Sequence, residues 1–479
     1  MLTEYVLCSN QVPVDRSGGT EMDMSQYHKI FGTCRIPGLT KDSLCFHGQD
    51  PDPPRHIVVM HQNHFFRLDV HGKNNQLLNV SQLQAQLQSI LERSTRPAVP
   101  LGLLTTQNRN VWGQAYKALL KASAENAASL REVQRSLFLV CLDAVVQPST
   151  GNAMTDAALQ CLHGGGTSGN SGNRWFDKTI QFVVGASGRV GLTYEHSPAE
   201  GPPIANLMDH IVDYMASGRA SKSLLAVETS RPRRLQFTVP SDLEAQIHQA
   251  GTVLDSLVED LEMTCFVYDK YGKTFMKAKG VSPDSFIQMA IQLAFYRVHG
   301  EPAAHYESAS TRMFAGGRTE TIRSCSEESA AFCAAALDAS AAPRHQRRLL
   351  LQAVAAHNAY AKQAVKGEGV DRHLLGLKLA AIELGMDVPA IFMDVAYARS
   401  AHMRLSTSQV PARCEAFMCY GPLVPDGYGC CYNPRSASIV FGVSALNSSP
   451  ETHSSTFRDA LEASLTQMRE LLELPDDAA

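Results

Sequence analysis

The feature that most constrains this fold is a predicted β-hairpin that ends at a histidine. Residues 179–184 are apolar and β-prone, residues 185–188 supply turn residues, and residues 190–194 run back as a second strand. His196 follows the second strand at the start of a loop rich in proline and glycine. A strand end holds the base of such a loop rigidly, and reactive side chains are common in this position.

A carboxylate stands close to this histidine in the sequence. Glu200 follows His196 by four residues and can turn back to hold one imidazole nitrogen. The other nitrogen would then accept a proton, so the pair is a candidate general base with an orienting partner. The alternative is a hydrogen-bonded histidine at a strand end with no catalytic role.

Length and composition predict a folded chain of more than one domain and exclude several classes of function. The 479 residues are enough for two or three domains, and the contents of 44% apolar and 19% charged residues are ordinary for a globular protein. The net charge of −4 provides no basic surface for nucleic acid. The twelve cysteines form no C-x-x-C motif and no zinc-type spacing, so we predict reduced thiols and no metal site. No apolar run approaches the roughly 18 residues of a membrane span.

Periodicity predicts a mixed α/β (α+β) chain. The predicted strands are residues 56–60, 64–70, 235–239 and 439–443, and the predicted helices are residues 80–91, 123–135, 242–263, 282–298 and 454–474. Residues 137–146 fit either a buried strand or a helix end. The pattern changes near Pro240, so we place an N-terminal domain at 1–240 and a C-terminal domain at 241–479.

A basic turn precedes the strongest predicted helix, residues 282–298. Ser282 is a candidate N-cap, Pro283 fits the first turn, and Gly300 follows the end. The lysines that precede this helix are Lys273, Lys277 and Lys279. Together with the helix N-terminus they favour the phosphate groups of a nucleotide-like ligand. A solvated basic turn is the alternative, and the glycine-rich run at 164–173 is a loop without the phosphate-binding motif.

Two further segments place arginines beside small polar residues. They are residues 318–324 and 369–374, and an arginine fork with a nearby hydroxyl is a natural carboxylate clamp. A structural ion pair is the alternative for each. Residues 405–411 are a strand-like run of hydroxyls, which either steady a developing oxyanion or form a polar edge strand.

Taken together, these pieces resemble the carnitine/choline acyltransferase family over nearly the whole chain. The segments that carry the resemblance are residues 173–178, 194–200, 282–284, 306–310, 318–324, 371–373, 406–411 and 424–429. The resemblance implies two sheet-containing domains that meet at a tunnel, with His196 in its middle. It also implies acyl transfer between coenzyme A and the hydroxyl of a quaternary amine, with coenzyme A as a substrate and no cofactor.

The resemblance also indicates the substrate. Thr319 and Arg372 match the carnitine members, where choline members have an apolar residue and an asparagine. Carnitine has a carboxylate for Arg372, whereas a buried arginine without a partner is costly. Met418 stands where a bulky residue blocks long acyl chains. The resemblance therefore implies reversible transfer of an acetyl, or other short-chain acyl, group between coenzyme A and L-carnitine.

The family's functional residues map onto this chain as three sets. The implied catalytic residues are His196 as the base, Glu200 as its orienter and Ser408 as the oxyanion donor. The implied coenzyme A ligands are Lys273, Lys277, Ser282, Asp284, Ser308 and Gln409. The implied carnitine ligands are Tyr306, Thr319, Arg372, Ser406 and Tyr420, with Tyr420 facing the trimethylammonium group.

Three other functions remain as alternatives. The first is choline O-acetyl transfer. The second is a non-catalytic form that binds coenzyme A or partners, since most of the family's helical stretch ahead of the part matching Ser25–His28 is absent here. A separate departure is Asn358, which replaces an arginine associated with coenzyme A and would weaken its binding. The third, a serine hydrolase, lacks a G-x-S-x-G elbow.

The expected partners are acetyl-CoA and L-carnitine, and we expect a monomer. The resemblance implies a mitochondrial or peroxisomal location. Neither Met1–Arg16 nor Pro475–Ala479 carries a recognisable address, so a cytosolic location is the alternative.

Overall fold

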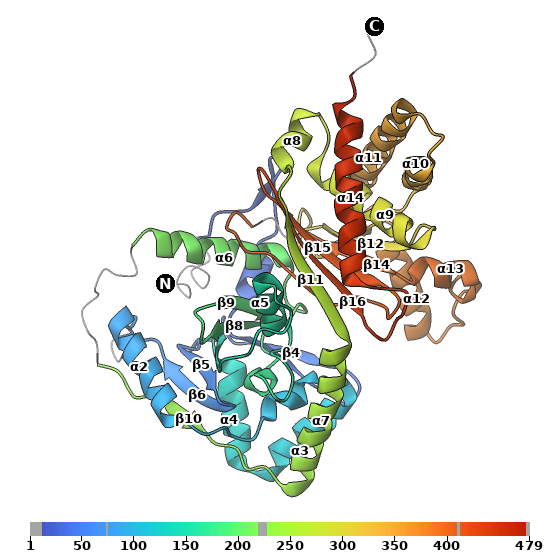
Figure 1. Cartoon of the computed structure of the whole chain (residues 1–479). Helices are drawn as coiled ribbons and strands as arrows, with labels where there is room; N and C mark the ends of the chain where they lie inside the picture. Colours follow the sequence, from blue (N-terminus) through green and yellow to red (C-terminus); the bar gives the residue numbers. More distant parts are fainter. Residues whose placement is uncertain (1–11, 73–74, 219–227, 410–411, 476–479) are drawn as a thin grey trace. The chain divides into compact units, whose positions relative to one another are not determined.

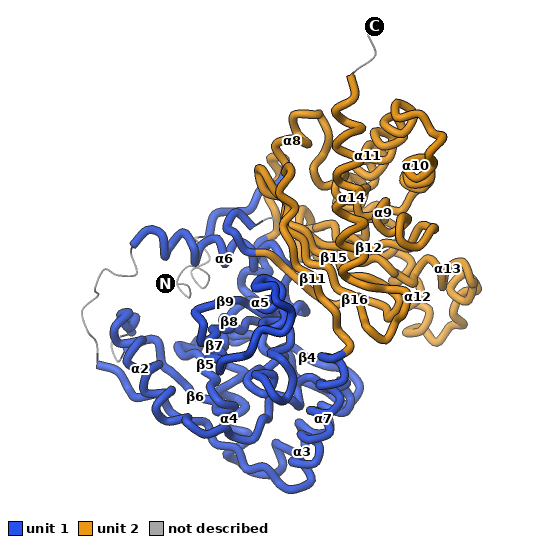
Figure 2. Tube along the Cα trace, viewed as in Figure 1, with its two compact units in different colours: residues 1–17, 24–259, 412–416 blue, residues 18–23, 260–411, 417–479 orange. Residues whose placement is uncertain are grey.

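The computed structural model describes residues 12–72, 75–218, 228–409 and 412–475. The predictions for residues 1–11 and 476–479 at the chain ends, and for Val410 and Pro411 of the hydroxyl run, concern residues outside these ranges. The chain forms two compact units, coloured separately in Figure 2. Unit 1 contains residues 1–17, 24–259 and 412–416, and unit 2 contains residues 18–23, 260–411 and 417–479. The domain boundary near Pro240 stays a prediction.

The sheet of unit 1 is six-stranded and mixed, in the order β10-β6-β5-β7-β8-β9. Its strands are β5 (His56–His61), β6 (His64–Asp69), β7 (Leu139–Asp143), β8 (Ile180–Gly185), β9 (Val190–Tyr194) and β10 (Arg233–Leu235), shown in Figure 1. β7 pairs in parallel with both β5 and β8, and the other pairs are antiparallel. The predicted strands at 56–60 and 64–70 and the hairpin at 179–194 are confirmed, and β7 decides the ambiguous run at 137–146 in favour of a strand.

Helices cover both faces of this sheet. On one face, Val58, Met60 and Leu139 pack with α3 (Arg109–Ala122), α4 (Ala124–Arg135) and α7 (Ser241–Asp260). On the other, Val59 and Ile180 pack with α2 (Val80–Arg93) and α6 (Gly201–Ala216). Burial on both faces accounts for the continuous apolar sequence of β5. The remaining elements of unit 1 are η1 (Ser25–Lys29), β3 (Thr33–Ile36), β4 (Ser43–Phe46), η2 (Leu101–Thr106), α5 (Ala153–Leu162) and η3 (Ser171–Asn173).

The sheet of unit 2 is also six-stranded and mixed, in the order β11-β16-β15-β14-β12-β13. Its strands are β11 (Leu261–Tyr268), β12 (His305–Ser310), β13 (Thr319–Ile322), β14 (Leu405–Ser408), β15 (Tyr428–Pro434) and β16 (Ile439–Leu446). β14 pairs in parallel with both β12 and β15. Two mixed sheets with helices confirm the predicted α/β class, and β16 confirms the strand predicted at 439–443.

Helices pack on one face of this second sheet (Figure 1). They are α9 (Pro283–His299), α10 (Glu327–Leu337), α11 (Pro343–Val365) and α14 (Ser454–Glu473). α9 confirms the predicted helix and its caps, because the Ser282 hydroxyl accepts from the backbone of Ser285 and Gly300 adopts a left-handed conformation with φ of 72°. The other elements are α8 (Lys273–Ala278), α12 (Asp371–Glu383), η5 (Ala390–Met393) and α13 (Val395–Ala401), besides the short β1 (Arg16–Ser17) and β2 (Thr20–Glu21).

Two sequence predictions about the junction of the units are wrong. The strand predicted at 235–239 is the shorter β10, which ends at Leu235. The helix predicted at 242–263 ends at Asp260, and the following residues begin β11, where Leu261 pairs with Leu446. The three apolar or acidic residues 261–263 fit a helical period locally, but pairing with β16 decides their conformation. No helix among the described residues has the length and apolar character to cross a lipid bilayer.

Candidate functional site

The predicted histidine–glutamate pair forms in unit 1. β9 ends at Tyr194, and His196 lies two residues beyond it with its ring 5.3 Å from that of Tyr194. The imidazole Nε2 lies 3.3 Å from the Glu200 Oε2. The His196 side chain is 58% exposed, whereas that of Glu200 is 9% exposed. The structure therefore combines an accessible imidazole with a buried carboxylate partner.

Local structure fixes the position of Glu200. It is the N-cap residue of α6, and prolines follow in the first turn of that helix. Its backbone N–H donates to the Oε1 of Gln26 at 2.8 Å. The carboxylate lies at the N-terminal end of the helix, where the helix dipole favours negative charge.

The loop between β9 and α6 is further ordered by Glu195. The Oε1 of Glu195 accepts from the Ser197 hydroxyl at 2.6 Å and lies 3.4 Å from the Arg35 guanidinium. Its own backbone N–H donates to the carbonyl of Thr179, which extends the hairpin ladder by one residue. Hydrogen bonds of Glu195 and Ser197, the two neighbours of His196 in the chain, therefore order the loop from which His196 projects.

In unit 2, most of the predicted carnitine residues share one face of the sheet. Side chains alternate along β12, so Tyr306 and Ser308 lie opposite to Glu307, which is buried toward the helices. Tyr306 pairs with Ser406 in the strand register, which places Ser406 and Ser408 on the same face as Tyr306. Thr319 joins this face because it pairs with Ser310 across β12 and β13.

The two predicted arginine segments behave differently. Arg372, in the first turn of α12, donates from Nη2 to the Thr319 hydroxyl at 3.2 Å and from Nε to the Thr319 carbonyl at 3.3 Å. Its guanidinium meets no carboxylate among the described residues. Arg323 instead makes a two-pronged ion pair with Asp371, at 3.0 and 2.7 Å. The structural alternative therefore holds for Arg323, while Arg372 remains available to a ligand carboxylate.

Tyr420 and Met418 lie on the segment that precedes β15. The Tyr420 hydroxyl lies 3.5 Å from the Ser406 Oγ, and its carbonyl accepts from the Ser444 hydroxyl at 2.7 Å. Burial raises the pKa of Tyr420 well above its usual value, so the phenol stays protonated. Met418 is half-buried. Tyr420 therefore joins the set formed by Tyr306, Thr319, Arg372 and Ser406.

The predicted coenzyme A residues fall into two groups. Lys273 and Lys277 are exposed on α8, and Ser282 and Asp284 lie at the N-terminus of α9. Ser308 lies on β12, and Gln409 directly follows β14. Lys279, the third lysine of the basic turn, is exposed just beyond α8.

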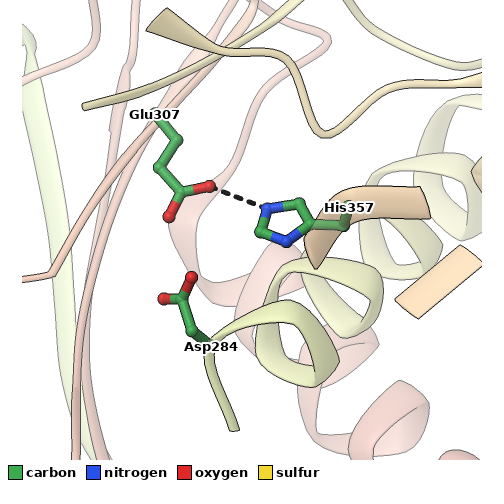
Figure 3. A group of neighbouring side chains, drawn as sticks. All are labelled: Asp284, Glu307 and His357. Atoms are coloured by element: carbon green, nitrogen blue, oxygen red, sulfur yellow. Dashed lines mark hydrogen bonds and ion pairs between the residues drawn. The ribbon is translucent and has the colours of Figure 1, made fainter. Parts of the chain in front are cut away.

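Sequence reasoning missed a cluster in which Asp284 meets Glu307 and His357 (Figure 3). The His357 Nε2 lies 2.9 Å from the Glu307 Oε2, and the Tyr432 hydroxyl donates to the Asp284 Oδ1 at 2.6 Å. Burial and the nearby Glu307 charge raise the pKa of Asp284 to about 6. Burial opposes ionisation of Glu307, but its interactions with His357, His305 and Gln288 together outweigh burial and lower the Glu307 pKa. The three residues are far apart in the chain, so no local motif predicts the cluster.

These features define a two-sheet α/β protein with a histidine–carboxylate pair in one unit and a hydroxyl-lined sheet face in the other. Residues 4–463 match the choline/carnitine O-acyltransferase family model. The chain belongs to this family.

Relatives of known activity agree with this membership. The chain is 45% identical to a carnitine O-acetyltransferase of Homo sapiens over 98% of its own length and 75% of the relative's. It is 44% identical to a carnitine O-acetyltransferase of Columba livia, over 96% and 74% of the two chains. A choline O-acetyltransferase of Sus scrofa is 40% identical over 98% and 74%.

Proposed function

We propose that this chain transfers acetyl groups reversibly between coenzyme A and the hydroxyl of L-carnitine. The observation that carries the proposal is the contact between an exposed His196 and a buried Glu200 in a member of this family. Family membership supports acyl transfer, and the relatives support carnitine over choline. By the resemblance, the protein is a monomer of mitochondria or peroxisomes.

In the proposed mechanism, His196 is the general base. It accepts the carnitine hydroxyl proton while the oxygen attacks the thioester carbonyl, and Ser408 donates to the resulting oxyanion. When the intermediate collapses, the C–S bond breaks and the imidazolium returns the proton to the thiolate. A positioned base supplies about 10²–10⁴-fold, so alignment of the two substrates must supply much of the remaining acceleration. The direct reaction needs no covalent enzyme intermediate.

The substrate assignment depends on Arg372. A carnitine carboxylate fits the guanidinium that already donates to Thr319, and it would form a charge-assisted hydrogen bond. Choline has no carboxylate for this position. Tyr306, Ser406 and Tyr420 would complete the carnitine site, and Met418 would limit the acyl chain.

Coenzyme A would bind along both groups of predicted ligands. Lys273 and Lys277 offer exposed ammonium groups near the N-terminus of α9, which suits phosphates. Ser282 and Asp284 lie at that same helix end, and Ser308 and Gln409 would contact the pantetheine arm.

The test is an assay of the purified chain with acetyl-CoA and either L-carnitine or choline. We expect thiol release that requires L-carnitine and that is lost in His196→Ala, while coenzyme A binding, measured by calorimetry, survives. Preference for choline would contradict L-carnitine as the substrate and support choline O-acetyl transfer. Coenzyme A binding without any His196-dependent transfer would support the non-catalytic form.

A further inference from the structure

The cluster of Asp284, Glu307 and His357 lies outside the proposed catalytic pair, and it shares Asp284 with the proposed coenzyme A site. One ligand atom from each residue lies within 4.8 Å of the other two, and Figure 3 shows the three side chains converging. α9, β12 and α11 each supply one member. Glu307 and His357 are 5% and 3% exposed, and Asp284 is half-buried, so the cluster is open only on the Asp284 side.

The charges in this cluster do not balance. Two carboxylates face each other, and among the described residues no lysine or arginine forms an ion pair with either one. His357 is the one basic side chain in hydrogen-bond contact, through Glu307.

We propose that Asp284, Glu307 and His357 bind one divalent transition-metal cation of the zinc class. Two carboxylate oxygens and one imidazole nitrogen form a donor set that such cations take in proteins. A +2 ion would neutralise the two carboxylates, with His357 as a neutral ligand. Ligand distances of about 2.0–2.2 Å allow two ligand atoms to lie up to about 4.4 Å apart, so only a small contraction is needed.

A buried polar atom beside the cluster has no hydrogen-bond partner among the described residues. Gln288 is completely buried; its Nε2 donates to the Thr407 hydroxyl at 2.9 Å and to the Tyr432 hydroxyl at 3.0 Å, and its Oε1 has no hydrogen-bond partner. The Tyr432 hydroxyl contacts both Asp284 and Glu307, at 2.6 and 3.3 Å. Rotation of the Gln288 amide would turn this oxygen toward Tyr432 and so toward the cluster, at the loss of the two hydrogen bonds that Nε2 donates.

The Nδ1 of His357 is hydrogen-bonded to a neighbouring side chain, as the non-ligating nitrogen of a metal-bound histidine usually is. Its Nδ1 lies 2.9 Å from the Ser285 hydroxyl, which fixes the ring orientation and leaves Nε2 facing the carboxylates. Outer partners of this kind orient histidine ligands. Protons compete with a cation for ligand atoms of these types, so binding should strengthen as pH rises.

Cobalt(II) is the most informative probe, because its absorption spectrum distinguishes oxygen and nitrogen ligands from the thiolates of the chain's twelve cysteines. The chelator-treated, full-length chain is titrated with Co²⁺ without coenzyme A, so the outcome is independent of acetyl transfer. We expect one equivalent to give visible d–d absorption without a thiolate charge-transfer band. His357→Gln and Glu307→Gln should each weaken binding at least about tenfold.

The matched control is His345→Gln, an exposed histidine on the same helix, α11, which should bind like the parent. Asp284→Asn is the second test variant, because a substitution at a half-buried side chain disturbs folding less than one at a fully buried side chain. Far-ultraviolet circular dichroism checks that each variant is folded. Absence of Co²⁺ binding, a thiolate band, or unchanged binding in folded Asp284→Asn or His357→Gln would overturn the proposal.

Discussion

The Nε2 of His196 and the Oε2 of Glu200 lie 3.3 Å apart, and the two side chains differ sharply in exposure. Glu200 is held at the start of α6 by its backbone bond to Gln26, so the carboxylate is the fixed member of the pair. The imidazole is the member that a substrate can reach. This division suits a base whose orientation is set from behind by a carboxylate.

The first prediction concerns Glu200→Gln, which keeps the shape and removes the charge. A hydrogen bond to a charged group contributes about 1.5–3 kcal/mol, so kcat should fall about 10- to 150-fold. KM for both substrates should change little. Steady-state kinetics measure this split, and Glu195→Gln in the same loop is the matched control. An equal loss in the control would assign the effect to loop structure.

Arg372→Asn should weaken carnitine binding selectively. Loss of one charge-assisted interaction should raise KM for L-carnitine about 10- to 150-fold and leave KM for acetyl-CoA unchanged. Arg372→Lys keeps the charge but loses the planar guanidinium that donates to Thr319, so its KM for L-carnitine should lie between those of the parent and Arg372→Asn. Kinetics with both substrates varied would check this. Unchanged carnitine KM in Arg372→Asn would contradict the proposed clamp.

Met418→Gly should extend the range of acyl chains. Each methylene that gains a buried site contributes about 0.8 kcal/mol, so kcat/KM should rise about fourfold per added CH₂ until the new space is filled. A series of acyl-CoA substrates of increasing length measures the effect. Met418→Leu conserves volume and should keep the short-chain profile. If Met418→Gly kept that profile too, another residue would set the limit.

Local signals predicted the elements that carry their own start and stop residues. Ser282 and Gly300 marked α9, and the turn residues before Val190 marked the hairpin that leads to His196. The junction at Leu261 was missed because a distant strand, β16, determines its conformation.

The candidate site shows the same division between local and distant effects. Glu200 was predictable because it lies one loop from His196. The partners of Asp284 were not, because Glu307 and His357 reach it from other elements and no spacing connects them. Arg323 and Arg372 looked alike in sequence, and only the position of Asp371 separates an ion-paired arginine from an available one.

The last prediction concerns acid stability and His163. The ring is mostly buried after α5, its Nδ1 accepts from the Gly165 backbone N–H at 3.0 Å, and burial, followed by the charge of Arg174, lowers its pKa to about 4. The unfolded chain, with a pKa near 6.5, therefore binds more protons than the folded chain between these values. Stability should fall as pH drops through this window, by about 2 kcal/mol at pH 5 from this residue.

His163→Asn isolates this contribution, because the Asn Oδ1 can replace Nδ1 as the acceptor for Gly165 without taking up a proton. The variant should lose about 2 kcal/mol less than the parent between pH 7 and pH 5, measured by urea unfolding at each pH. His248→Asn, on the exposed side of α7, should leave the pH slope unchanged. If His163→Asn kept the parent slope, the acid sensitivity would have to come from other buried groups, of which His56, with a pKa lowered to about 4 by burial, is the next to replace.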